Sequence, residues 1–210
     1  MGGKAAGSDG GHEATPDMVV YCWEALLAAL ERRALAVVPT FADGEAPLFV
    51  TWTTTEGVPS GADADLRGCI GCLEPIGLHK GLAEYAETSA FRDRRFSPIR
   101  DAEVPHLVCE VNLLTRFEEA ARWDDWVVGT HGIILEFRHQ GRRFSATYLP
   151  HVAEQQGWDV VRTVDSLARK AGWQGAVDDA LRSIMRVTRY QSSASELSWA
   201  DFCRQTARQA

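Results

Sequence analysis

The stretch HLVCEVNLLT, His106 to Thr115, decides the fold class. Apolar residues alternate with charged and polar ones along it, which is the pattern of a half-buried β-strand. On that pattern Glu110 and Asn112 point to the face away from the core. The stretch therefore predicts a strand over Leu107–Leu114, paired within an antiparallel or mixed sheet.

The sequence on either side predicts more strands and several helices. β-branched, aromatic and alternating segments predict strands at Leu48–Thr54, Leu66–Leu73, Gly132–Arg138 and Arg142–Tyr148, with a hairpin turn near Gln140 and Gly141. Apolar residues at helical spacing predict helices within Met18–Leu30, Leu78–Ser89, Val161–Ala171 and, after a serine cap, Ser195–Gln209. Because helices and strands alternate irregularly, we expect an α+β fold with helices flanking one side of the sheet.

Composition limits the classes of protein that fit. The chain has 210 residues, of which 45% are apolar and 24% charged, enough for a sizeable core. Residues 1–14 are rich in glycine and poor in apolar residues, so we expect a flexible tail there and one domain, of two subdomains, over residues 15–210. The formal charge of −7 makes nucleic acid an unlikely partner, and no apolar run has the length of a membrane span.

Cysteine usage points to a reducing compartment. The five cysteines are odd in number and widely spread, and no signal peptide is visible. We therefore expect reduced thiols in an intracellular protein, cytoplasmic, nuclear or both.

The motif LRGCIG, Leu66 to Gly71, is the strongest candidate for chemistry. On a regular strand Arg67 and Cys69 share a face, so the cation could lower the pKa of the thiol. Gly68 and Gly71 could form a bulge or let a ligand approach the backbone. We expect Cys69 to lie in a cleft partly open to solvent, with Glu110 as the partner of Arg67. The alternative is a structural arginine, packing glycines and a core cysteine.

A nucleophilic cysteine needs a base. His131 lies between small residues at the start of a strand, and Glu110 could orient it, which gives a Cys-His-acid hypothesis of Cys69, His131 and Glu110. The alternative, which the sequence favours, is a turn histidine that bonds to the backbone.

Metal and anion sites have weaker support. Cys69 and Cys72 form a C-x-x-C without a second ligand pair, and strand alternation tends to place them on opposite faces, so we predict no metal site and can name no cofactor. A basic cluster of Arg92, Arg94, Arg95 and Arg100 could hold phosphate, but a solvated helix end explains it better.

Several strings in this order carry a family resemblance: PLFVTW, LRGCIG, GLAEYAETSAFRDRRF, GTHGIILEF, TYLPHVAEQQGWD and DSLARKAGW. Together, over roughly Asp17 to Arg208, they resemble the AMMECR domain family, named for a human chromosomal region deleted in a syndrome with Alport nephropathy, midface hypoplasia and elliptocytosis. The resemblance implies an α+β fold with two unequal lobes that share a cleft. It implies no settled activity.

Two classes of function follow. In the first, the chain is a small-ligand binder or a cysteine-dependent, enzyme-like protein that uses the LRGCIG cleft, with Arg67, Gly68 and Gly71 at the ligand. In the second, it is a noncatalytic interaction module in a regulatory pathway such as transcription, repair or translation. The partner is then an unidentified small molecule or protein.

Overall fold

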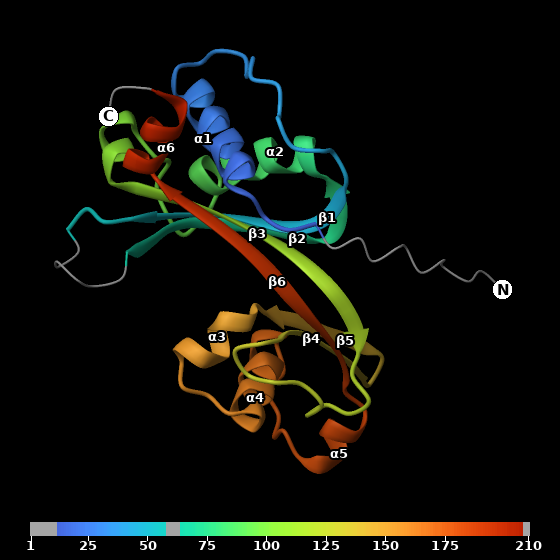
Figure 1. Cartoon of the computed structure of the whole chain (residues 1–210). Helices are drawn as coiled ribbons and strands as arrows, with labels where there is room; N and C mark the ends of the chain where they lie inside the picture. The colour runs from blue at the N-terminus through green and yellow to red at the C-terminus, as the bar shows by residue number, and fades with distance from the viewer. Residues whose placement is uncertain (1–11, 58–63, 208–210) are drawn as a thin grey trace. The chain divides into compact units, whose positions relative to one another are not determined.

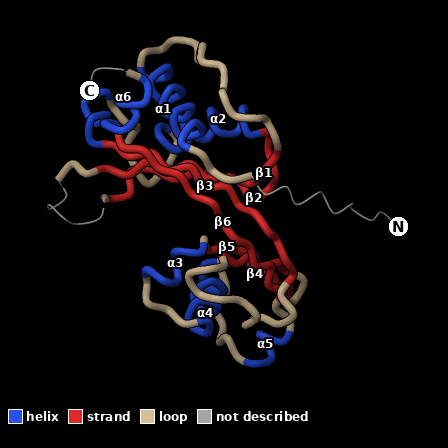
Figure 2. The backbone as a smooth tube through the Cα atoms, viewed as in Figure 1, coloured by secondary structure: helices blue, strands red, loops and turns tan. Residues whose placement is uncertain are grey.

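A computed structural model of the protein describes residues 12–57 and 64–207. Over these residues the chain forms one six-stranded sheet, in the order β2-β1-β3-β6-β4-β5, and a set of helices (Figures 1 and 2). The strands are β1 (Glu45–Thr54), β2 (Asp65–Gly77), β3 (Leu107–Glu119), β4 (Gly132–His139), β5 (Arg142–Tyr148) and β6 (Arg186–Ser198). The helices are α1 (Pro16–Leu30), α2 (Leu78–Phe91), the 3-10 helix η1 (Asp101–His106), α3 (Pro150–Gln155), α4 (Val160–Lys170), α5 (Asp179–Ser183) and α6 (Trp199–Thr206). The α+β prediction is confirmed.

The described chain divides into two compact units. The N-terminal unit contains residues 12–113 and 193–207, and the inserted unit contains residues 114–192. Strands β3 and β6 each contribute residues to both units, because the divisions at residues 113 and 192 fall inside them.

The N-terminal unit buries one face of β1–β3 under helices. Figure 1 shows α1, α2 and α6 on the same side of these strands. Leu48, Val50 and Trp52 alternate along β1, are fully buried and belong to the same core cluster as the helices. The indole of Trp52 lies 4.9 Å from that of Trp23 in α1 and donates its N–H to the carbonyl of Ala86 in α2. The residues between them in β1 therefore face the opposite side of the sheet.

The inserted unit packs α3 and α4 against the hairpin of β4 and β5. Its core includes Leu135 and Phe144 from the strands and Leu167 from α4, all buried. The hairpin turns at Gln140 and Gly141, which have φ angles of 49° and 79° and so form the two-residue turn that suits the twist of a hairpin. The predicted turn is confirmed at these residues.

The predicted strands and helices are present with shifted ends. Strand β1 begins at Glu45 and β2 continues to Gly77, beyond the predicted Leu48 and Leu73. The helix expected within residues 195–209 begins only at Trp199, and Ser198 caps it by accepting from the N–H of Asp201. Residues before it belong to β6, which the sequence did not reveal. Of the tail predicted at residues 1–14, residues 1–11 lie outside the described part.

No helix among the described residues has the length and apolar character needed to cross a bilayer.

Candidate functional site

The LRGCIG motif lies in β2, an edge strand of the sheet whose neighbour is β1. Trp52 pairs with Gly68, but Thr53 pairs with Leu66, so Arg67 is an extra residue in the strand. Such a bulge changes the face to which the extra side chain points. The predicted sharing of a face by Arg67 and Cys69 depended on regular alternation, and the bulge interrupts it between them.

Arg67 binds the segment that follows α2. Its Nε and Nη2 donate to the two carboxylate oxygens of Glu103 at 2.7 and 3.2 Å, and its Nη1 and Nη2 donate to the carbonyls of Ser97 and Pro98. The expectation that Glu110 binds Arg67 was wrong, because Glu103 takes this place. Burial acts to raise the pKa of Glu103, but the bonds from Arg67 and from the N–H of Arg100 outweigh it and leave the pKa below its usual value.

Cys69 is half-buried and lies beside a hydroxyl, outside the buried core. The Thr51 hydroxyl donates to Sγ at 3.2 Å. Burial raises the pKa of the Cys69 thiol above its ordinary value, although the Thr51 bond and the Arg95 guanidinium favour the thiolate. The cation near the thiol is therefore Arg95, and it does not offset burial. The predicted lowering of the thiol pKa by Arg67 is not what the structure shows.

Asp93 and Arg95 hold the main chain of Cys69. The Asp93 carboxylate accepts the N–H of Cys69 at 3.0 Å, and Nη2 of Arg95 donates to the Cys69 carbonyl at 3.2 Å. Arg95 also binds Asp93 at 2.7 Å, and these bonds hold the pKa of Asp93 well below its usual range. We name this pair the Asp93–Arg95 clamp. It uses polar groups that an edge strand otherwise leaves open.

Glu110 shares a row with Cys69. Thr51 pairs with Cys69 on one side and with Glu110 on the other, so the three residues lie side by side across β2, β1 and β3. They occupy the face of the sheet opposite Val50 and Trp52. The Glu110 carboxylate accepts from Nδ2 of Asn112, which is buried, at 2.5 Å. The row therefore combines a thiol, a hydroxyl and a carboxylate.

The two glycines of the motif have close neighbours. A Cβ atom on Gly68 would lie 2.1 Å from the carbonyl oxygen of Ser89 in α2. On Gly71 it would lie 2.2 Å from the carbonyl oxygen of Leu48 and 2.4 Å from the ring of Phe49. Both positions need glycine for packing, which is one of the two reasons the sequence offered. Their role in ligand binding stays a prediction.

His131 belongs to the inserted unit, whereas Cys69 and Glu110 belong to the N-terminal unit. Its Nδ1 accepts the N–H of Val127 at 3.0 Å, as expected of a turn histidine that bonds to the backbone. The triple of Cys69, His131 and Glu110 stays a prediction.

The two cysteines of the C-x-x-C face opposite sides of the sheet. Cys69 pairs with Thr51, and Cys72 pairs with the buried Leu48, as strand alternation predicted. Among residues 12–57 and 64–207, no group of three or more histidine, cysteine, aspartate or glutamate side chains has the arrangement of a metal site.

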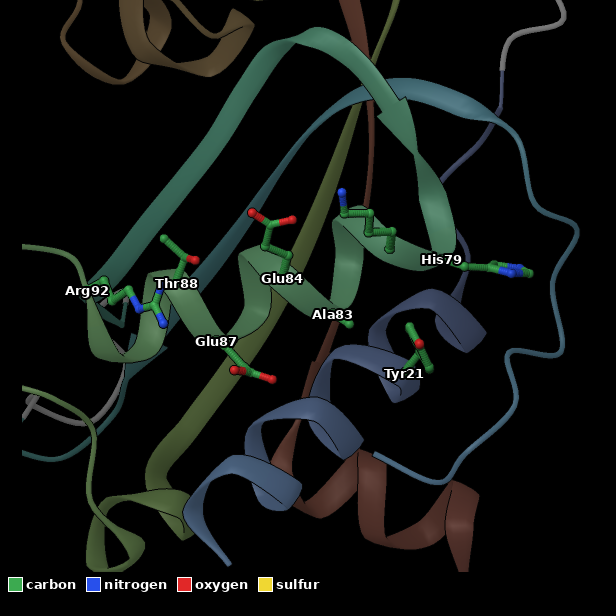
Figure 3. A pocket seen from close by; sticks show the side chains of 8 residues that line it. Tyr21, His79, Ala83, Glu84, Glu87, Thr88 and Arg92 are labelled. Carbon is green, nitrogen blue, oxygen red and sulfur yellow. The ribbon is translucent and has the colours of Figure 1, made fainter. Parts of the chain in front are cut away.

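A groove of about 470 Å³ lies beside α2 in the same unit (Figure 3). Figure 3 shows side chains of α2 along it and Tyr21 of α1 at one end. Its charged lining includes Lys80, Glu84, Glu87 and Arg92. Since both signs are present in equal number, the groove selects no class of ligand by charge.

Sequence reasoning missed Thr51, Asp93 and Arg95 as partners of Cys69. Asp93 stands among arginines in RDRRF, a charged run that was interpreted as a solvated helix end. An acid within a basic run was the available signal, since burial of Asp93 requires a cation beside it.

Comparison with known proteins gives relatives without an assigned activity. An uncharacterised protein of Arabidopsis thaliana is 42% identical over 191 residues, which cover 90% of this chain and 87% of that protein. An uncharacterised protein of Schizosaccharomyces pombe is 38% identical over 82% of this chain and 86% of its own length. The crystal structure of an uncharacterised protein from Pyrococcus horikoshii matches with a TM-score of 0.67 and 27% identity, covering 85% of this chain and 89% of that one. The AMMECR1 family model matches residues 19–195. The chain therefore belongs to the AMMECR1 family.

Proposed function

We propose that the protein binds a small polar ligand on the sheet face that carries Cys69, Thr51 and Glu110. The strand register supports this proposal, because it aligns these side chains in one row across neighbouring strands. With adjacent strands about 4.8 Å apart, the Cα atoms of Cys69 and Glu110 are separated by roughly 10 Å. A ligand of a few heavy atoms is long enough to contact both ends of the row.

The groups in the row favour a ligand with N–H donors. The Glu110 carboxylate offers acceptor oxygens, and it is held by the amide of Asn112. Thr51 donates to the sulfur of Cys69, so the thiol proton is available to a ligand acceptor. Because burial raises the pKa of Cys69, the thiol is neutral near pH 7 and serves binding in preference to nucleophilic attack.

The test is an NMR titration of the whole chain with spermidine, guanosine and L-glutamine as donor-bearing probes. We expect at least one probe to shift the amide resonances of Thr51, Cys69 and Glu110. Glu110→Gln, which removes the charge but keeps the shape, should weaken this binding. Glu74→Gln, an exposed glutamate of β2, is the matched control and should bind as the wild type does. Unchanged binding by Glu110→Gln, or no response to any probe at millimolar concentration, would contradict the proposal.

The second candidate is a noncatalytic interaction module. The contacts of Arg67, Gly68 and Gly71 favour it, since each of these residues packs or bonds within the chain. On this alternative, substitutions in the motif lower the thermal midpoint and Glu110→Gln has no effect on the binding of any probe. The same titration therefore separates the two candidates.

A further inference from the structure

A cavity of about 510 Å³ lies along helix α4 in the inserted unit. It shares no residue with the row on β1–β3. Trp158, Arg162, Ser166 and Arg169 are among the residues that line it, together with Asp159 and Asp165. Its character depends on which of these charges are already neutralised.

Both aspartates of the cavity have partners. Asp159 is the N-cap of α4, and its Oδ1 accepts the N–H of Arg162 at 2.7 Å. Oδ1 of Asp165 accepts from Nη2 of Arg182 at 2.7 Å. Within the described part of the chain, neither Arg162 nor Arg169 forms a salt bridge. The uncompensated charge in this cavity is therefore positive.

The helix aligns the two arginines. Arg162 and Arg169 are seven residues apart, so they lie on one face of α4 about two turns, or roughly 10 Å, from each other. Ser166 stands between them, and its hydroxyl is 3.0 Å from that of Tyr148. Two guanidinium groups on long side chains can reach one anion above this hydroxyl. Such an arrangement is typical of phosphate binding.

An aromatic surface lies beside the cations. The half-buried ring of Trp158 is 5.8 Å from the guanidinium carbon of Arg162 and 5.9 Å from the Tyr148 ring. Val161, which also lines the cavity, is 45% exposed. Trp158 and Val161 give the cavity an apolar part at the start of α4. A flat ring can pack there, as bases do on aromatic side chains.

We propose that this cavity binds a mononucleotide, with the phosphate between Arg162 and Arg169 and the base against Trp158. The ligand class follows from the pairing of unneutralised guanidinium groups with an aromatic surface on one helix face. A polynucleotide fits less well, because the whole chain carries a formal charge of −7.

The test is calorimetry on the full-length protein with adenosine 5′-monophosphate (AMP), adenosine and inorganic phosphate. AMP should bind saturably, and adenosine or phosphate alone should bind about tenfold more weakly, because each lacks one half of the contacts. Arg162→Gln and Arg169→Gln should each weaken AMP about tenfold through loss of a charge-assisted bond. Both residues are exposed, so the variants should fold, which circular dichroism checks.

Arg94→Gln is the matched control. Arg94 is an exposed arginine of the N-terminal unit, and its loss should leave AMP affinity unchanged. The proposal is overturned by absence of saturable AMP binding, by equal affinity for AMP and phosphate, or by unchanged affinity in both cavity variants. Tighter binding of a short RNA than of AMP would also overturn it. These outcomes do not affect the site on β1–β3, because the two sites share no residue.

Discussion

At the scale of single residues, Cys69 shows how position controls thiol chemistry. A cation lies close to it, yet burial has the larger effect and raises the pKa of the thiol. The Thr51 hydroxyl, which donates to the sulfur, stabilises the thiolate only in part. The neighbourhood of an arginine in sequence is thus a poor guide to a reactive cysteine, because the bulge and Glu103 direct Arg67 elsewhere.

Labelling of Cys69 should therefore require alkaline pH. In a Cys72→Ser background, which removes the other half-buried cysteine, the rate of iodoacetamide labelling should rise with a midpoint above the ordinary thiol pKa of about 8.5. Adding Cys69→Ser should abolish the reaction in the folded protein, since the other three cysteines are buried. A midpoint below 8.5 would indicate an activated thiolate and favour the enzyme-like alternative.

Gly68 should be intolerant of even one methyl group. Gly68→Ala places a Cβ 2.1 Å from the Ser89 carbonyl, so β2 and α2 must separate. We expect the free energy of unfolding, measured with urea, to fall by about 1–3 kcal/mol, the usual cost of overpacking. Gly77→Ala is the control, because nothing lies within 4 Å of a Cβ there and its φ of −55° suits alanine. Equal stability of the two variants would show that α2 does not press on Gly68.

At the scale of elements, the edge strand β2 is closed by side chains. The Asp93–Arg95 clamp binds both main-chain polar groups of Cys69, and the Ser89 hydroxyl accepts the N–H of Ile70. These bonds tie the strand to α2 and to the residues after it. An open edge invites pairing with another chain, so the clamp also protects against association.

Asp93→Asn should weaken this part of the fold at neutral pH. Asparagine keeps the shape but loses the ion pair with Arg95, and we expect a loss of about 1.5–3 kcal/mol in the free energy of unfolding. The folded-state pKa of Asp93 is lowered, chiefly by Arg95, so its stabilisation is present above the unfolded pKa of about 3.9 and is lost as pH falls toward the folded value.

The difference between the wild type and Asp93→Asn should accordingly narrow in urea titrations below about pH 4. Asp65→Asn, an exposed aspartate at the start of β2, controls for general charge effects. A difference that stays constant from neutral to acid pH would rule out the ion pair as its source.

Elements with a strong local pattern could be predicted, and those without one could not. Residues 107–114 alternate regularly and are a strand, and Gln140 and Gly141 supply the turn conformations of a hairpin. Strand β6 is rich in serine and arginine and has few large apolar residues. Its pairing with β4, from Gly132 with Tyr190 to Glu136 with Arg186, determines it, and such long-range pairing leaves no local signal.

The site was predictable to the same extent. Cys69 and Glu110 were found because their residue types stand out in strands of clear parity. Arg67 was placed on the wrong partner because a one-residue bulge cannot be seen in the sequence. Asp93 lies 24 residues from the Cys69 it binds, so only the fold brings them together.

At the scale of the whole molecule, charge is the property that most limits possible partners. The chain has 29 acidic and 22 basic residues. The basic cluster after α2 is partly neutralised, since Arg95 binds Asp93 at 2.7 Å and Arg100 lies 3.6 Å from the Glu103 carboxylate. Little of this cluster is therefore free to displace counterions from a polynucleotide.

We accordingly expect weak, unspecific binding to nucleic acid. Fluorescence anisotropy with labelled single-stranded RNA and double-stranded DNA should give dissociation constants no tighter than about 1 μM at physiological salt, as for non-specific contacts. What binding exists should weaken further as salt rises, because it depends on the few unneutralised arginines. Arg92→Gln with Arg94→Gln should lower it, whereas Arg95→Gln should instead lower stability through loss of the clamp. Nanomolar affinity for one sequence at physiological salt would contradict this expectation, and would mean that a local surface overrides the acidic balance of the chain.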